Sequence, residues 1–147
     1  MNFWDSSAIL PLIVNESYTP VIRKIVASDA EMIVWWATPV ECVSALARLE
    51  REGTLSLAAM EVCLQRLADF QQSWYEIQPN QVVREMAVRL LRTHTLRSAD
   101  ALQLSAAICA AENRPSTLPM ICLDTRLCTA ARKEGFSILP DIGVGPS

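Results

Sequence analysis

The chain has 147 residues, of which 51% are apolar and 20% are charged. That length is typical of one domain, and so high an apolar fraction argues against a disordered chain. No apolar run reaches the roughly 18 residues that a membrane-spanning helix needs; the longest are residues 9–14 and 32–37. Asp5 stands where a secretory signal would carry a basic residue, so no such signal is apparent.

The five cysteines form no Cys-x-x-Cys pair, and most of them lie within apolar segments. An odd number of dispersed cysteines is typical of small apolar side chains in a reducing compartment. We therefore expect a cytoplasmic protein without disulfides.

The charge balance is acidic, with 13 basic against 16 acidic residues and a formal net charge of −3. Proteins that bind nucleic acids usually have a basic surface. Either nucleic acid is not the ligand, or some of the acidic residues have a special role.

Short apolar runs of strand length alternate with longer segments of helical period. In chain order, the pattern predicts a strand at residues 2–5, helices at 6–14 and 18–28, a strand at 32–36, helices at 39–52 and 57–74, a helix after Pro79 that includes 83–91, a helix at 98–112, a strand at 120–123, a helix at 125–134 and a strand at 137–139. The helix at 98–112 is apolar almost all round and should be buried. Trp35, Trp36 and Trp74 are expected in the core.

Strands separated by helices predict an α/β fold, with a central parallel sheet of about four to five short strands and helices on both faces. We expect one domain over residues 1–142 and a short tail at 143–147. In such sheets, ligands bind beyond the carboxyl ends of the strands, near the point where the strand order reverses.

Four acidic residues fall where this edge of the sheet could gather them. Two follow strands and two lie in the first turns of helices: Asp5, Glu41, Asp100 and Asp124. Clustered carboxylates repel one another, and they are tolerated mainly around a cation. Oxygen ligands suit Mg²⁺ or Mn²⁺.

Helix capping is an alternative explanation for each acid taken singly. Asp5 and Asp124 could cap the helices that follow them, and Asp100 could favour a helix dipole. Glu41 could complete a capping box with Thr38. Capping does not explain why all four fall at one predicted edge.

Other chemistries find little support in the sequence. The four glycines form no nucleotide-binding loop, and the single histidine, His94, is expected at a solvated or dipole-favoured helix end. A receiver-like phosphoacceptor domain would need an acid pair after the first strand and a lysine, but Lys24 and Lys133 are the only lysines.

Four segments of the chain, in order, resemble the motifs of the PIN-domain family, and in particular its VapC-type toxins. They are FWDSSAI at residues 3–9, TPVECVSAL at 38–46, LRSADALQLSA at 96–106 and ICLDTRL at 121–127. The resemblance covers nearly the whole chain. It departs from the family pattern at Cys122, where a threonine is usual.

The resemblance implies a metal-dependent endoribonuclease of a type II toxin–antitoxin system. The four acids would hold one or two Mg²⁺ or Mn²⁺ ions, and Ser7 would be an auxiliary residue that hydrogen-bonds Asp5 or a metal-bound water. Arg97 and Arg126 could contact RNA phosphates or could be ordinary surface residues.

The resemblance also implies a homodimer and a VapB-type antitoxin, whose C-terminal segment would lie across the helices near residues 40–70. The alternative is a non-catalytic PIN scaffold that binds RNA or a partner protein. Without the four site acids, the chain carries 13 basic and 12 acidic residues. The acidic balance is therefore compatible with weak, metal-mediated binding of RNA.

Overall fold

A central sheet of five parallel strands organises the chain. The computed structural model describes residues 1–141, so the tail predicted at 143–147 lies outside the described residues. The strands are β1 (Asn2–Trp4), β2 (Met32–Trp35), β3 (Tyr75–Ile77), β4 (Met120–Ile121) and β5 (Ile138–Leu139), in the order β3-β2-β1-β4-β5. The predicted α/β class with a parallel sheet is confirmed.

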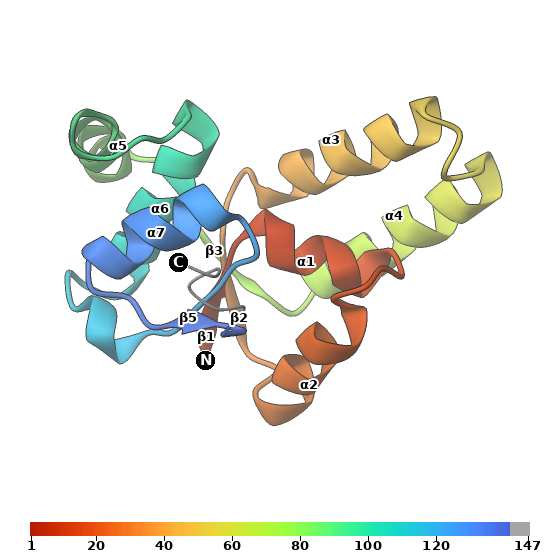
Figure 1. Cartoon of the computed structure of the whole chain (residues 1–147), viewed down its shortest axis with the longest axis horizontal. Coiled ribbons are helices and arrows are strands. Elements are labelled where there is room, and N and C mark those ends of the chain that lie inside the picture. Colours follow the sequence, from red (N-terminus) through yellow and green to blue (C-terminus); the bar gives the residue numbers. More distant parts are fainter. Residues whose placement is uncertain (142–147) are drawn as a thin grey trace.

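Within residues 1–141, seven helices cover the two faces of this sheet, in two layers that lie to the right and left of it in Figure 1. One layer contains α1 (Ser6–Ile13), α2 (Thr19–Ser28), α3 (Thr38–Arg51) and α4 (Leu57–Gln71). The other contains α5 (Gln81–Thr93), α6 (Ser98–Ala110) and α7 (Thr125–Lys133), and a short 3₁₀ turn, Pro115–Thr117, precedes β4. Each predicted helix is present, with ends that differ by a few residues at most.

Alternate residues of the central strands face the two layers. Phe3 and Met120 are paired across β1 and β4 and belong to the core under α5, α6 and α7. Trp4 and Ile121 are the next pair, and they belong to the core under α1, α3 and α4. This period of two is that of a strand buried on both faces.

Two of the predicted core tryptophans, Trp35 and Trp74, are buried, but Trp36 is 48% exposed and that prediction was wrong. β2 ends at Trp35, so Trp36 lies in the turn that leads to α3 and not in the strand. The sequence also did not predict β3. It is a three-residue edge strand that is only partly buried, so it lacks a continuous apolar run.

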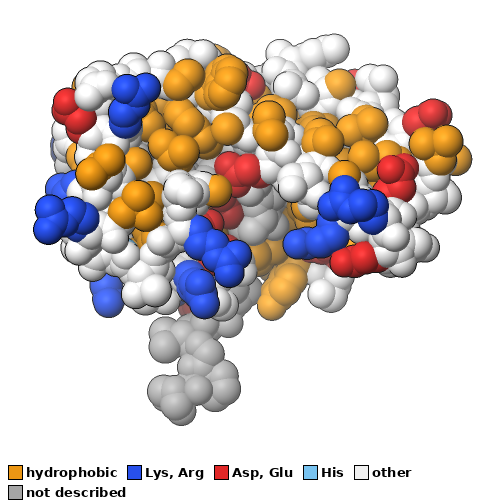
Figure 2. Space-filling model, turned by 90° about the horizontal axis from the view of Figure 1, so that it is seen from above, with side chains coloured by type: hydrophobic (Ala, Val, Ile, Leu, Met, Phe, Trp, Pro, Cys, Tyr) orange, Lys and Arg blue, Asp and Glu red, His pale blue; other side chains and the backbone are white. Residues whose placement is uncertain are grey.

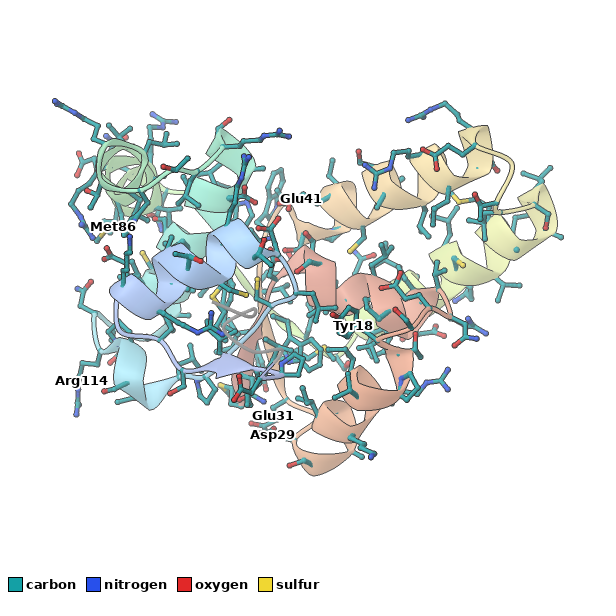
Figure 3. The ribbon with its side chains drawn as sticks, viewed as in Figure 1. Tyr18, Asp29, Glu31, Glu41, Met86 and Arg114 are labelled. Atoms are coloured by element: carbon teal, nitrogen blue, oxygen red, sulfur yellow. The ribbon has the colours of Figure 1, made fainter. Side chains whose placement is uncertain are left out.

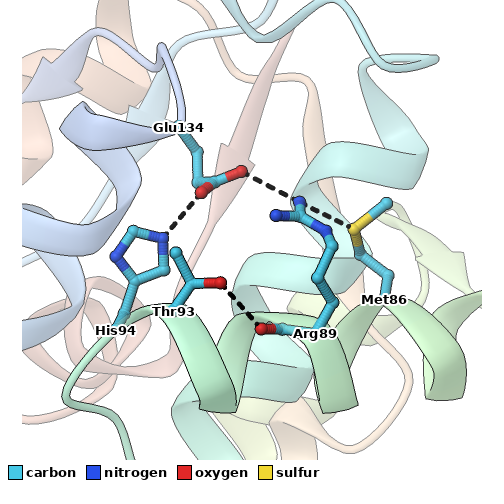
Figure 4. Close-up of polar contacts among 5 residues, drawn as sticks. All are labelled: Met86, Arg89, Thr93, His94 and Glu134. Carbon is cyan, nitrogen blue, oxygen red and sulfur yellow. Dashed lines mark hydrogen bonds and ion pairs between the residues drawn. The ribbon is translucent and has the colours of Figure 1, made fainter.

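A buried histidine connects α5 to the end of α7, as Figure 4 shows. His94 Nε2 lies 2.6 Å from Glu134 Oε2, and Arg89 Nη2 donates to the other carboxylate oxygen at 3.0 Å. The His94 side chain is only 6% exposed and therefore not solvated, but His94 is the C-cap residue of α5, the helix end that was the other predicted position for it. Burial acts to raise the pKa of Glu134, but the hydrogen bonds from His94 and Arg89 outweigh it and lower that pKa.

β1 is the strand at which the chain order reverses, because β2 pairs with one of its edges and β4 with the other. The carboxyl ends of β1 and β4 therefore mark the position in which this fold class binds ligands.

Within residues 1–141, no helix is long and apolar enough to cross a membrane.

Candidate functional site

Asp5 follows the last residue of β1 and is almost fully buried, with 3% of its surface exposed. It is also the N-cap of α1, because its carboxylate accepts the backbone N–H of Ser7 at 3.1 Å. The hydroxyl of Ser7 donates to Asp5 Oδ2. Burial raises the pKa of Asp5 to about 6, against these hydrogen bonds and with help from the charges of Asp124 and Asp100. Capping and a place in the site are thus compatible.

Ser7 ties the first strand to the fourth. Its hydroxyl oxygen, besides donating to Asp5, accepts the backbone N–H of Leu123 at 2.9 Å, just beyond β4. Cys122, in the position where the resembled family has a threonine, has its Sγ 3.7 Å from Asp5 Oδ2. A thiol is a weak donor, so most of the support for Asp5 comes from Ser7.

Glu41 lies in the first turn of α3 and is held from two sides. The Ser6 hydroxyl donates to Oε1 at 2.9 Å, and the Gln103 amide donates to Oε2 at 3.2 Å. Burial raises the pKa of Glu41 to about 7, and the charge of Asp5 adds to the effect. Figure 3 shows Glu41 at the upper edge of the molecule, between the two helical layers.

The capping-box interpretation of Glu41 is wrong. The N-cap of α3 is Ala37, and Thr38 is already helical and makes no capping hydrogen bond. The Thr38 hydroxyl instead accepts a hydrogen bond from Gln103 at 2.9 Å. The Glu41 carboxylate is therefore available to the site.

Asp100 and Asp124 complete the acidic group. Asp124 is the N-cap of α7 and accepts the backbone N–H of Leu127 at 3.0 Å. Burial raises the pKa of Asp100, as does the charge of Asp124, while Arg97 and Arg126 act to lower it. Both arginines are exposed and lie close enough to Asp100 to affect its charge.

The structure brings all four predicted acids to one edge of the sheet, since each lies close enough to another to affect its protonation. Figure 2, which views this edge from above, shows acidic side chains at its centre and basic ones on two sides. Within residues 1–141, the structure contains no group of at least three His, Cys, Asp or Glu side chains in an arrangement that could hold a metal ion. The donor chemistry nevertheless fits a hard divalent cation, because such an ion would relieve the repulsion among these carboxylates.

Sequence reasoning missed two residues of the site, Ser6 and Gln103. Gln103 is fully buried in α6, and its Oε1 has no hydrogen-bond partner among the described residues. Its signal was the only amide side chain in a helix that is apolar almost all round, since a buried polar group needs a partner. Ser6 gave no signal of its own beyond its place next to Asp5.

Comparisons with known proteins identify the fold. No protein-family model matches the sequence, and no curated protein matches it either. Several solved structures are similar, among them the following two. One is described as a toxin–antitoxin complex from Klebsiella pneumoniae, with a TM-score of 0.60, 15% identity, and coverage of 86% of this chain and 88% of the other. The second is described as FitAcB from Neisseria gonorrhoeae, with a TM-score of 0.65, 15% identity, and coverage of 94% and 96%.

The fold is PIN-like. This confirms the fold that the sequence motifs predict, over most of the chain. At 15% identity, the likeness concerns the fold alone, so the chemistry must be argued from the residues of this chain.

Proposed function

We propose that this protein is a metal-dependent endoribonuclease and the VapC-type toxin of a toxin–antitoxin pair. The observation that carries the proposal is the set of four carboxylates from four distant segments, gathered at the point where the strand order reverses. Burial raises the pKa of three of them, so ionising these acids lowers the stability of the folded protein. Such costly groups are typical of functional sites. The motif resemblance supports the same function, as does the likeness in fold to a structure described as a toxin–antitoxin complex.

The residues that would hold Mg²⁺ or Mn²⁺ are Asp5, Glu41, Asp100 and Asp124. A bound divalent ion supplies an activated water and stabilises negative charge on phosphoryl oxygens. Ser7 orients Asp5, and a carboxylate that remains free of the cation can accept the proton of the attacking water. Arg97 and Arg126, whose charges act on Asp100, would contact substrate phosphates beside it.

The proposed partners are an RNA substrate, a VapB-type antitoxin and a second copy of the chain. Exposed apolar side chains on α3 and α4 are compatible with the antitoxin surface expected near residues 40–70. They include Val40 at 67%, Leu57 at 69% and Val62 at 51% exposure. Covering apolar surface of this kind is what a protein partner provides.

The alternative is a PIN scaffold that binds RNA or a partner without cutting. It is favoured by the lack of a ready-made arrangement of metal ligands within residues 1–141. Incubating RNA with the protein and Mg²⁺, with and without EDTA, separates the two. The nuclease proposal predicts cleavage that EDTA abolishes, and RNA that stays intact in both arms would favour the scaffold.

A further inference from the structure

A row of polar and basic side chains continues from Glu41 along one face of α3. Ser44, Arg48 and Arg51 follow Glu41 at intervals of three or four residues, the spacing of neighbours on one helix face. The last two lie about 10 Å and about 15 Å along the helix from Glu41. The row therefore begins at the candidate site and leads away from it.

This row lines a cleft between α1 and α3 of about 450 Å³. Its wall consists of Ser6, Glu41, Ser44, Ala45, Arg48 and Arg51. Two of these, Ser6 and Glu41, are already hydrogen-bonded to each other inside the site. The cleft and the acidic site are thus continuous, and a ligand that occupies one can extend into the other.

The two arginines are available for a ligand. Both side chains are exposed, and the ion pairs found among residues 1–141 involve neither of them. Their place in the last turns of α3 favours positive charge through the helix dipole. The helix dipole could explain why basic residues stand at this end of α3. It does not explain why both arginines line the cleft that begins at Glu41.

The charges of this edge suit a polyanion that passes across the acids. Arg97 and Arg126 lie beside Asp100, whereas Arg48 and Arg51 lie on the side of Glu41. Figure 2 shows two groups of basic side chains on this edge with acidic side chains between them. Single-stranded nucleic acids bind along basic grooves that follow the backbone, and the planar fork of arginine matches a phosphate group.

We propose that the cleft between α1 and α3 binds the phosphate backbone of the RNA strand next to the cleavage point, through Arg48 and Arg51. This proposal rests on the nuclease function proposed above. An RNA is favoured over an acidic peptide because an RNA strand bound at the acids has further phosphates on either side of the reacting one. Those that lie along α3 would meet the positive charges of Arg48 and Arg51.

The test compares two double variants in an Asp100→Asn background, which is expected to bind RNA without cutting it. One carries Arg48→Ala with Arg51→Ala. The other is a control of equal charge, Arg23→Ala with Lys24→Ala, on the exposed surface of α2, which lies at the opposite end of the molecule in Figure 1. The probe is a fluorescein-labelled single-stranded RNA that the wild-type protein cleaves, and its dissociation constant is measured by anisotropy between 50 and 200 mM KCl.

Loss of two phosphate contacts should weaken binding by roughly tenfold and reduce the slope of log affinity against log salt by about 1.4. The control should stay within about twofold of its parent. If wild-type protein cuts RNA but the two double variants bind alike, the proposal for the cleft is wrong and the nuclease function stands. If wild-type protein neither cuts nor binds any RNA, the nuclease function itself fails. Loss of antitoxin binding with unchanged RNA affinity would assign the cleft to the antitoxin and overturn the proposal.

Discussion

The buried amide nitrogen of Gln103 lies 3.2 Å from Oε2 of Glu41 and donates a hydrogen bond to it. The same nitrogen is 2.9 Å from the hydroxyl oxygen of Thr38, one turn earlier in α3. Because Gln103 belongs to α6, this contact fixes a carboxylate of one helical layer from a helix of the other. We therefore regard Gln103 as a positioning residue for Glu41.

Replacing Gln103 with Met keeps the side-chain volume but removes both hydrogen bonds to α3. We expect RNA cleavage to fall by about 10- to 100-fold, as for other residues that orient metal ligands. Gln103 also acts to lower the pKa of Glu41, so the remaining activity should shift to higher pH. The measurement is a pH–rate profile of RNA cleavage.

Ser105→Ala is the matched control for this experiment. Ser105 is also a fully buried polar residue of α6, but its hydroxyl donates to the carbonyl of Val83, away from the acids. It should lose stability without a shifted pH profile. Equal profiles for the two variants would show that Gln103 acts only on the fold.

The raised pKa values predict how stability changes with pH. An acid whose pKa is higher in the folded state binds its proton more tightly there, so its contribution is lost as pH rises through the folded value. For Asp5 this window runs from 3.8 to about 6, and for Glu41 from 4.5 to about 7. In metal-free protein, Asp5→Asn should therefore be more stable than wild type at pH 8, by about 1–3 kcal/mol.

Urea unfolding in EDTA, followed by tryptophan fluorescence, measures this difference. The gain should shrink as pH falls through the window and approach zero only well below the unfolded pKa of 3.8, where Asp5 is protonated in both states. Adding Mg²⁺ at pH 8 should stabilise wild type but not the variant. A variant that is less stable than wild type at pH 8 would contradict the electrostatic explanation.

Ser7→Ala tests the connection between β1 and β4. The change leaves the backbone N–H of Leu123 without its hydroxyl acceptor and removes a donor to Asp5, at a cost of about 1–3 kcal/mol. Ser73→Ala, which removes an exposed hydroxyl bonded to the Phe70 carbonyl, should cost less than about 0.5 kcal/mol. Similar losses in the two variants, measured by urea unfolding, would show that Ser7 is not a structural link.

Glu134→Gln tests the contact between α5 and α7. A carboxyl with a lowered folded pKa stabilises the protein above its unfolded pKa, and this contribution is lost as pH falls through the folded value. The variant should thus be less stable than wild type at neutral pH and equally stable at strongly acidic pH. Thermal unfolding at several pH values would measure the difference, and a constant difference across that range would be inconsistent with it.

The sequence allowed much of the fold to be predicted, because most strands are continuous apolar runs and most helices have a clear period. It also allowed the four acids to be predicted at one edge, since Asp5 and Asp124 follow parallel strands whose carboxyl ends meet there, and Glu41 and Asp100 lie in the first turns of helices. What it could not provide is contact between layers. The amide of Gln103 reaches Glu41 only because α6 packs behind β2, and Thr38 accepts from that amide instead of capping its own helix.

The remaining errors have similar causes. Trp36 has the character of a core residue, but the chain turns one residue before it and leaves it exposed. The contact that buries His94 at the end of α5 was not predicted, because its partner, Glu134, is 40 residues away in the sequence. β3 was missed because an edge strand is buried too little to show an apolar pattern.

If the acidic cluster cuts RNA with the help of a divalent cation, loss of one of its carboxylates should remove most of the activity. The most direct test compares initial rates of RNA cleavage in Mg²⁺ for wild type, Asp100→Asn and Asp69→Asn. Asp69 is an exposed acid of α4 that pairs with Gln65, so its variant carries the same change in charge away from the site. We predict a loss of at least about 100-fold for Asp100→Asn and a change within about twofold for Asp69→Asn. Cleavage by Asp100→Asn at the wild-type rate would contradict the account.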